Sequence, residues 1–152
     1  MIVITGAAGF IGSALIAKLV QESYYDIVAV DNFNREDKNK NLEDKELKER
    51  VDRSDFFNWL DQNQERVQII IHIGARTDTA EFNRDLLWEL NYDYSVKMFH
   101  KCIEYGLPLI YASSAATYGK GENGYSDDHN VVGKLKPLNP YGESKNEFDK
   151  YV

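Results

Sequence analysis

The sequence predicts an α/β fold, a doubly wound parallel sheet with helices on both faces. Strand and helix signals alternate along most of the chain. A glycine-rich turn joins the first strand to the first helix, and apolar runs typical of buried parallel strands recur between the helices. The 152 residues, 43% of them hydrophobic, suit one domain with a single core, which we place at residues 1–152.

The glycine-rich turn is the most informative local feature. An apolar strand, Met1 to Ile4, leads into the segment Thr5-Gly6-Ala7-Ala8-Gly9-Phe10-Ile11-Gly12. Gly6 allows a tight turn, Gly9 lets the backbone approach a pyrophosphate, and Gly12 lets the helix lie close to the strand. The free N–H groups at the start of the helix then face the anion. The segment therefore predicts a dinucleotide-binding turn.

An amphipathic helix and a second strand follow this turn. The helix is indicated by apolar residues at helical spacing, namely Ile11, Leu15, Ile16, Leu19 and Val20. The strand covers Ile27 to Val30 and ends in Asp31. An acidic residue there, about 20 residues after the glycines, is placed to bind the ribose of an adenosine. This context favours dinucleotide binding over a plain turn.

The next segment is less regular. Asn32 to Asp52 is rich in charges of both signs, which is typical of a solvated loop or helix face, and no third strand is legible there. We expect Ser54 to cap a helix, and we expect its larger side chains to enter the core: Phe56, Phe57, Trp59 and Leu60. Gln68 to Ile73 predicts a buried central strand.

The rest of the chain predicts a long helix, a strand, a long loop and a final helix. The long helix spans roughly residues 84–105 and ends at Gly106 and Pro108. Its apolar residues recur at helical spacing: Leu86, Leu87, Leu90, Tyr94, Met98 and Cys102. Leu109 to Ala112 is the next strand, and the loop from Ser113 to Pro140 is long enough to be functional or mobile. The final helix begins near Tyr141.

A second chemical signal lies on that final helix. Tyr141 and Lys145 are four residues apart, so the phenol and the ammonium lie on one helical face. A tyrosine is poorly ionised at neutral pH, but a neighbouring lysine cation and an oxidised nicotinamide would both favour the phenolate. The pair therefore predicts an acid/base unit, given that it follows a dinucleotide-binding turn and a strand that ends in Ser113 and Ser114.

These segments resemble the extended short-chain dehydrogenase/reductase family, through TGAAGFIGS at the start, SSAATYG after the last strand and YGESK on the last helix. Longer strings, VDNF, IGART, ELNYDYS and KPLNPYGESK, are most similar to the heptose 6-epimerases of that family. The resemblance implies a Rossmann-like sheet and epimerisation of a nucleotide-activated sugar, ADP-glycero-manno-heptose, at C6 by transient oxidation and re-reduction with NADP, NAD being the other possible cofactor. Such heptoses serve lipopolysaccharide assembly.

The resemblance also implies site residues. Ser114, Tyr141 and Lys145 would form the catalytic set, with Lys145 also on the ribose hydroxyls. Lys38 and Arg53 would bind the 2′-phosphate of NADP. The residues implied to line the cofactor, besides the glycines Gly6, Gly9 and Gly12, are Phe10, Ile11, Asp31, Asn32, Ile73, Gly74, Ala75 and Asn91. The chain departs from the heptose epimerase pattern at Ile73, where a glutamate is expected, and at Arg76, where a small residue is usual.

Members of this family are about twice as long as this chain. The resemblance thus implies that residues 1–152 are the cofactor-binding part, without the substrate domain, and that this part binds cofactor but turns over nothing alone. It also implies a homo-oligomer of the full-length protein, paired through the long and final helices. Two alternative hypotheses about the function are a nucleotide-sugar 4-epimerase or 4,6-dehydratase, and a non-catalytic NADP-binding regulator. Ala115 and Ala116 count against a dehydratase, which needs an Asp-Glu pair there.

Composition excludes several other classes. The net charge of −7 would repel nucleic acid and anionic membranes. The single cysteine, Cys102, forms no internal disulfide, and we expect it to be a buried small apolar residue. The three histidines, His72, His100 and His129, show no ligand spacing, so we expect no metal site. With no long apolar stretch and no signal peptide, we expect a cytoplasmic protein.

Overall fold

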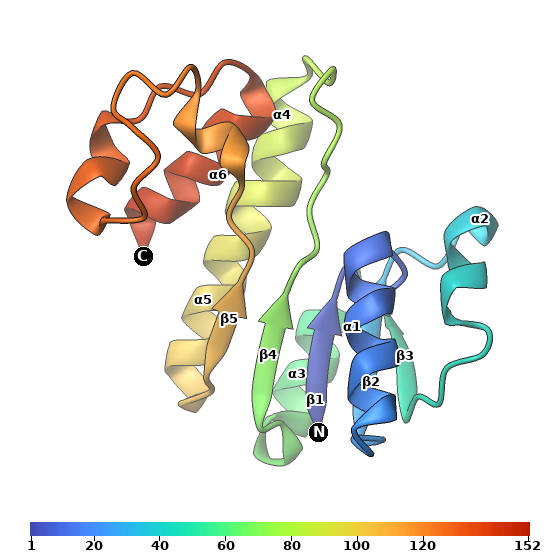
Figure 1. Cartoon of the computed structure of the whole chain (residues 1–152). Coiled ribbons are helices and arrows are strands. Elements are labelled where there is room, and N and C mark those ends of the chain that lie inside the picture. Colours follow the sequence, from blue (N-terminus) through green and yellow to red (C-terminus); the bar gives the residue numbers. More distant parts are fainter. The chain divides into compact units, whose positions relative to one another are not determined.

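The computed structural model describes residues 1–152 (Figure 1). The chain forms two compact units. The first comprises Met1–Gly74 and Lys101–Tyr111, and the second comprises Ala75–His100 and Ala112–Val152. No helix is long and apolar enough to cross a membrane.

The first unit is built on a parallel sheet of five strands in the order β3-β2-β1-β4-β5. The strands are β1 (Ile2–Thr5), β2 (Ile27–Asp31), β3 (Glu49–Asp52), β4 (Ile69–His72) and β5 (Leu109–Tyr111). Thr5 at the end of β1 is in register with Val30 of β2 and His72 of β4. The strand ending at Thr5 is therefore central, as the sequence predicts, and the sheet order reverses on its two sides.

Helices cover both faces of this sheet, which confirms the doubly wound prediction. α1 (Phe10–Gln21) lies in front of it and α3 (Phe56–Asn63) behind it (Figure 1). All five residues of β2 are buried, as a strand between two neighbours and two covered faces must be. The buried side chains of the core between the sheet and α1 are Ile4, Ala7, Ala8, Ile16, Ile27, Ala29 and Leu42.

In this unit the structure supplies a strand that the sequence left open, and one sequence prediction is wrong. The charged segment does contain a third strand, β3, after the short helices α2 (Glu36–Asn39) and η1 (Lys40–Leu42). β3 is an edge strand in which only Val51 is buried, so backbone pairing with β2 stabilises it and no apolar alternation marks it. Ser54 does not cap α3, because its N–H and hydroxyl both donate to the Asp52 carboxylate, at 3.0 and 2.8 Å. The cap position belongs to Asp55.

The second unit is helical. It contains α4 (Arg84–Leu87), the π-helix η3 (Trp88–Asp93), the first part of α5 (Tyr94–Tyr105), the short helices η4 (Ala115–Tyr118) and η5 (His129–Lys134), and α6 (Pro140–Tyr151). The predicted long helix thus includes six residues of π-helix, a form that is frequent at functional sites. α6 begins at Pro140, one residue before the predicted start, and the Asn139 side chain caps it by accepting the Gly142 N–H at 2.7 Å.

Candidate active site

The glycine turn of the first unit has no room for side chains at two of its glycines. Gly6 has a φ of +67°, and a Cβ there would lie 2.7 Å from the Gly74 backbone. A Cβ on Gly12 would lie 2.2 Å from the Gly6 carbonyl oxygen. α1 therefore starts in direct contact with the end of β1. No side chain caps α1, so its first N–H groups remain available to an anion. This geometry fits a dinucleotide pyrophosphate.

Asp31 lies beside this turn. One of its carboxylate oxygens accepts the Ala8 N–H at 2.9 Å, and the other accepts the Asn32 N–H at 2.8 Å. The residue is buried, yet each oxygen keeps a lone pair for a further donor such as a ribose hydroxyl. The structure thus brings together the glycine turn and the acidic residue that the sequence predicts for the adenosine ribose.

The two basic residues expected at a 2′-phosphate also lie in this unit. Arg53 directly follows β3, and its backbone N–H donates to the Asp31 carbonyl at 3.0 Å. Lys38 lies in α2, and its ammonium makes no ion pair. The arginine close to Lys38 in sequence, Arg35, is instead paired with Asp37 at 2.7 Å. Lys38 is therefore a free cation, and Arg53 has its backbone fixed next to Asp31.

Other residues expected to line a cofactor lie at the same ends of the strands. Phe10 is 86% exposed and Ile11 is 64% exposed at the start of α1. Asn32 follows β2, and its side chain accepts the Asn34 N–H. The Ile73 N–H donates to the Thr5 carbonyl at 3.3 Å, and the Gly74 N–H donates to the Thr5 hydroxyl at 3.1 Å.

The Thr5 and His72 side chains form a contact that sequence reasoning missed. The Thr5 hydroxyl and His72 Nδ1 are 2.6 Å apart, and both residues are buried. Because the same hydroxyl accepts from the Gly74 N–H, it joins the segments that follow β1 and β4 and holds Gly74 against Gly6. No spacing or periodicity in the sequence indicates that the Thr5 and His72 side chains meet.

The predicted acid/base pair lies on α6 of the second unit. Tyr141 is 9% exposed, and its hydroxyl has no hydrogen-bond partner in the chain. Lys145, one turn later, is 3% exposed and makes no ion pair or hydrogen bond. Burial lowers the pKa of the Lys145 ammonium, and the negative charge of Asp149 opposes this effect. A buried cation without a partner is costly, which is typical of a functional site.

Ser114 is brought next to this helix. It caps the short helix η4, where its Oγ accepts the Ala116 N–H at 3.2 Å, and η4 packs against α6. The contact is close: a Cβ on Gly142 would lie 2.7 Å from the Ala116 carbonyl oxygen. Glycine after Tyr141 is therefore required by the approach of the Ser114 segment, and the three predicted catalytic residues lie in the same unit.

Asn91 connects three segments of this unit. It lies in η3, is fully buried, and its Oδ1 accepts the Arg76 N–H at 2.7 Å. Its Nδ2 donates to the Arg76 carbonyl at 3.1 Å and to the Ser144 hydroxyl at 3.0 Å. Ser144 in turn donates to the Tyr141 carbonyl at 2.8 Å. The amide of Asn91 is thus used to join the segment after β4 to the helix that carries Tyr141.

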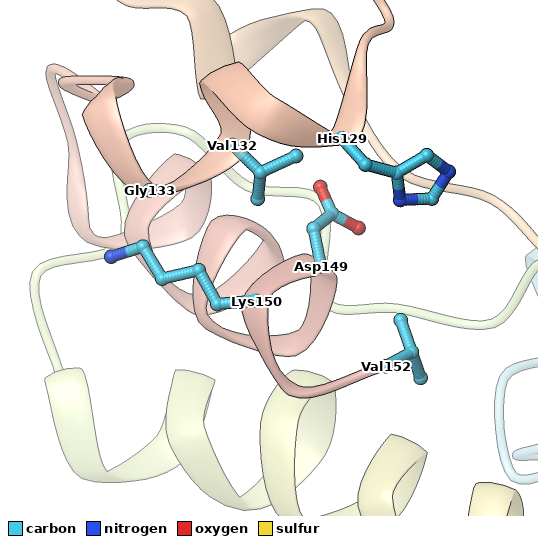
Figure 2. Close-up of a pocket in the computed structure, with 6 residues that line it drawn as sticks. All are labelled: His129, Val132, Gly133, Asp149, Lys150 and Val152. Atoms are coloured by element: carbon cyan, nitrogen blue, oxygen red, sulfur yellow. The ribbon is translucent and has the colours of Figure 1, made fainter.

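The second unit also contains a cavity of about 310 Å³ that none of the predicted site residues lines (Figure 2). Its lining residues come from η5 and the end of α6: His129, Val132, Gly133, Asp149, Lys150 and Val152. No group of three or more His, Cys, Asp or Glu side chains in the chain could hold a metal ion. Cys102 is buried, as expected, and burial raises the pKa of its thiol to about 11.

Comparison with known proteins decides the family. The model of the NAD dependent epimerase/dehydratase family matches residues 2–152. The chain belongs to this family. It is 41% identical over 156 residues to an ADP-L-glycero-D-manno-heptose-6-epimerase of Fusobacterium nucleatum, covering 100% of this chain and 47% of that protein.

Solved structures agree with this assignment. The ADP-L-glycero-D-manno-heptose-6-epimerase of Helicobacter pylori superposes with a TM-score of 0.77 at 30% identity, over 99% of this chain and 49% of that one. The UDP-glucuronic acid 4-epimerase of Bacillus cereus, in complex with UDP-glucuronic acid and NAD, has a TM-score of 0.79 at 26% identity, over 99% of this chain and 50% of that one. The chain therefore spans about half the length of the relatives it matches.

Proposed function

We propose that the full-length protein containing this chain is an epimerase of a nucleotide-activated sugar. The observation that carries the proposal is Lys145, a buried ammonium without a partner one turn from Tyr141, in a chain of this family. The likeness to the Fusobacterium and Helicobacter enzymes supports ADP-glycero-manno-heptose as the sugar and C6 as the inverted centre.

The cofactor we propose is NADP. The turn through Gly6, Gly9 and Gly12 would hold the pyrophosphate on the first N–H groups of α1, and Asp31 would accept from the adenosine ribose. The unpaired Lys38 ammonium, with Arg53, would hold the 2′-phosphate. The family description speaks of NAD, so the preference for NADP rests on these two cations.

In the proposed reaction, a nicotinamide dinucleotide held by the glycine turn and Asp31 would supply the reversible hydride acceptor. Tyr141, as phenolate, removes the proton of the sugar hydroxyl, so that the carbon oxidised by hydride loss becomes a carbonyl. Ser114 donates a hydrogen bond to the oxygen of this carbonyl. Lys145 would bind ribose hydroxyls, and its charge favours the phenolate of Tyr141. The proton then returns to the oxygen from Tyr141, and the product differs from the substrate at one carbon.

Hydride must return to the opposite face of the sugar, which requires the sugar to be held and reoriented. We propose that residues 1–152 alone bind NADP weakly and turn over nothing. Orientation can account for about 7 kcal/mol of barrier reduction, and the part of the relatives that this chain does not span would supply it. We also propose a cytoplasmic enzyme of lipopolysaccharide synthesis that forms homo-oligomers.

A UDP-sugar 4-epimerase is the second candidate, because the Bacillus cereus enzyme superposes as well as the heptose epimerase does. The deciding experiment offers the full-length protein ADP-glycero-manno-heptose and UDP-glucuronic acid in parallel, each with NADP or NAD, and measures inversion by NMR. Inversion at C6 of the heptose supports the first candidate. Inversion only at C4 of the UDP-sugar supports the second, and no inversion of either overturns both.

A further inference from the structure

One charged residue on α6 contacts the segment that carries Ser114. The Ser113 hydroxyl donates to Asp149 Oδ2 at 2.5 Å, across 36 residues of sequence. Asp149 follows Lys145 by four residues, so the carboxylate and the ammonium lie on the same face of the helix. The other oxygen, Oδ1, is buried and has no hydrogen-bond partner. The Asp149 carboxylate therefore contacts the residue before Ser114 and lies one helical turn after Lys145.

We propose that Asp149 is a positioning residue: its carboxylate ties the Ser113–Ser114 segment to α6 and supplies the negative charge beside Lys145. This inference rests on the proposed function only for the roles of Ser114 and Lys145. The contact fixes the start of η4, because Ser114 is the cap of that short helix and directly follows the tethered residue.

The charge of Asp149 acts on a cation whose pKa is lowered by burial. Burial lowers the pKa of Lys145, and Asp149 is the group whose charge raises it. On the elements packed against α6, Arg84 is paired with Glu143 at 2.6 Å, and the Tyr118 hydroxyl donates to Asp127. His129 and Asp149 line the same cavity, and the Asp149 carboxylate points toward His129 and Val132 (Figure 2). Lys150, in the same cavity, is paired with Glu147 at 2.6 Å.

The two parts of this role can be separated by two substitutions in the 152-residue chain. Asp149→Asn removes the charge but keeps an oxygen that accepts the Ser113 hydroxyl. Ser113→Ala keeps the charge but removes the hydroxyl. Ser113→Thr is the matched control, because it keeps both. Neither measurement below needs substrate or cofactor, so they test Asp149 even if the proposed function fails.

The charge is read from the titration of Lys145, followed by NMR of lysine labelled with ¹³C at Cε and assigned with Lys145→Arg. In Asp149→Asn the midpoint of the Lys145 titration falls, so that the ratio of neutral amine to ammonium at a fixed alkaline pH rises at least about threefold. In Ser113→Ala the midpoint of the Lys145 titration is unchanged. The tether is read from hydrogen exchange at the Ala116 and Thr117 amides, which bond Ser114. Exchange speeds up at least about fivefold in Ser113→Ala, and stays at the wild-type rate in Ser113→Thr.

The Ser113 end of the tether is exposed, so its loss shows in local exchange before it shows in global stability. An unchanged Lys145 midpoint in Asp149→Asn would overturn the electrostatic part of the proposal. Unchanged exchange in Ser113→Ala would overturn the tether. A uniform rise in exchange over all of α6 in both variants would show that Asp149 only stabilises the helix, and would overturn the proposal as a whole.

Discussion

Substitution of Asn91 should destabilise the second unit more than any exposed asparagine does. The side chain is fully buried and makes three hydrogen bonds, two to the Arg76 backbone and one to Ser144. At about 1 kcal/mol for each bond, Asn91→Ala should lower the free energy of unfolding by about 3 kcal/mol. The protein should still fold, because domains of this size are stable by about 5 to 15 kcal/mol.

The assay is urea denaturation followed by tryptophan fluorescence, with Asn83→Ala as the matched control. The Asn83 side chain makes one exposed hydrogen bond, in which it accepts the Leu86 N–H at 3.2 Å at the start of α4, and loss of this bond should cost about 1 kcal/mol. Asn91→Asp separates the contribution of the amide oxygen from that of the amide nitrogen, because it keeps the acceptor for the Arg76 N–H and removes both hydrogen-bond donors. If Asn91→Ala costs no more than Asn83→Ala, Asn91 does not join these segments as described.

Three further outcomes are expected. Lys38→Ala and Arg53→Ala should each weaken binding of NADP about tenfold and leave binding of NAD unchanged, measured by calorimetry, because one charge-assisted bond is worth about 1.5 kcal/mol or more; equal losses for both cofactors would contradict this. Tyr141→Phe in the full-length protein should lower turnover at least about 100-fold at nearly unchanged cofactor affinity, and an unimpaired variant would show that another residue is the base. Burial lowers the pKa of Lys145 in the folded protein, so the unfolded chain binds more protons between the lowered pKa and the ordinary lysine value. Over that pH range, the free energy of unfolding of the wild type should therefore rise relative to that of Lys145→Met. A difference in urea midpoints that does not change with pH would contradict this expectation.

The sequence was sufficient where a pattern reports directly on the backbone. The order of strands and helices follows from apolar runs and turns, and Gly6 and Gly12 stand where a Cβ would collide with backbone atoms. β3 was not legible, because an edge strand of mostly exposed residues has no apolar alternation to show. The prediction that Ser54 caps α3 is wrong because no sequence pattern indicates that the Ser54 hydroxyl donates to the Asp52 carboxylate instead.

The sequence indicates the glycine turn, Asp31 and the Tyr141–Lys145 pair of the candidate site, but not the hydrogen bonds that position them. The spacing of Tyr141 and Lys145 follows from helical geometry, whereas Asn91 reaches Ser144 across 53 residues and Ser113 reaches Asp149 across 36. Bonds at such separations depend on how helices pack, so no periodicity reports them. Yet they explain how Lys145 can be buried without a partner: α6 is held by Asn91 through Ser144 on one side and by Ser113 through Asp149 on another. We propose that α6, held at both points, keeps the Lys145 ammonium in place for the ribose hydroxyls of a cofactor.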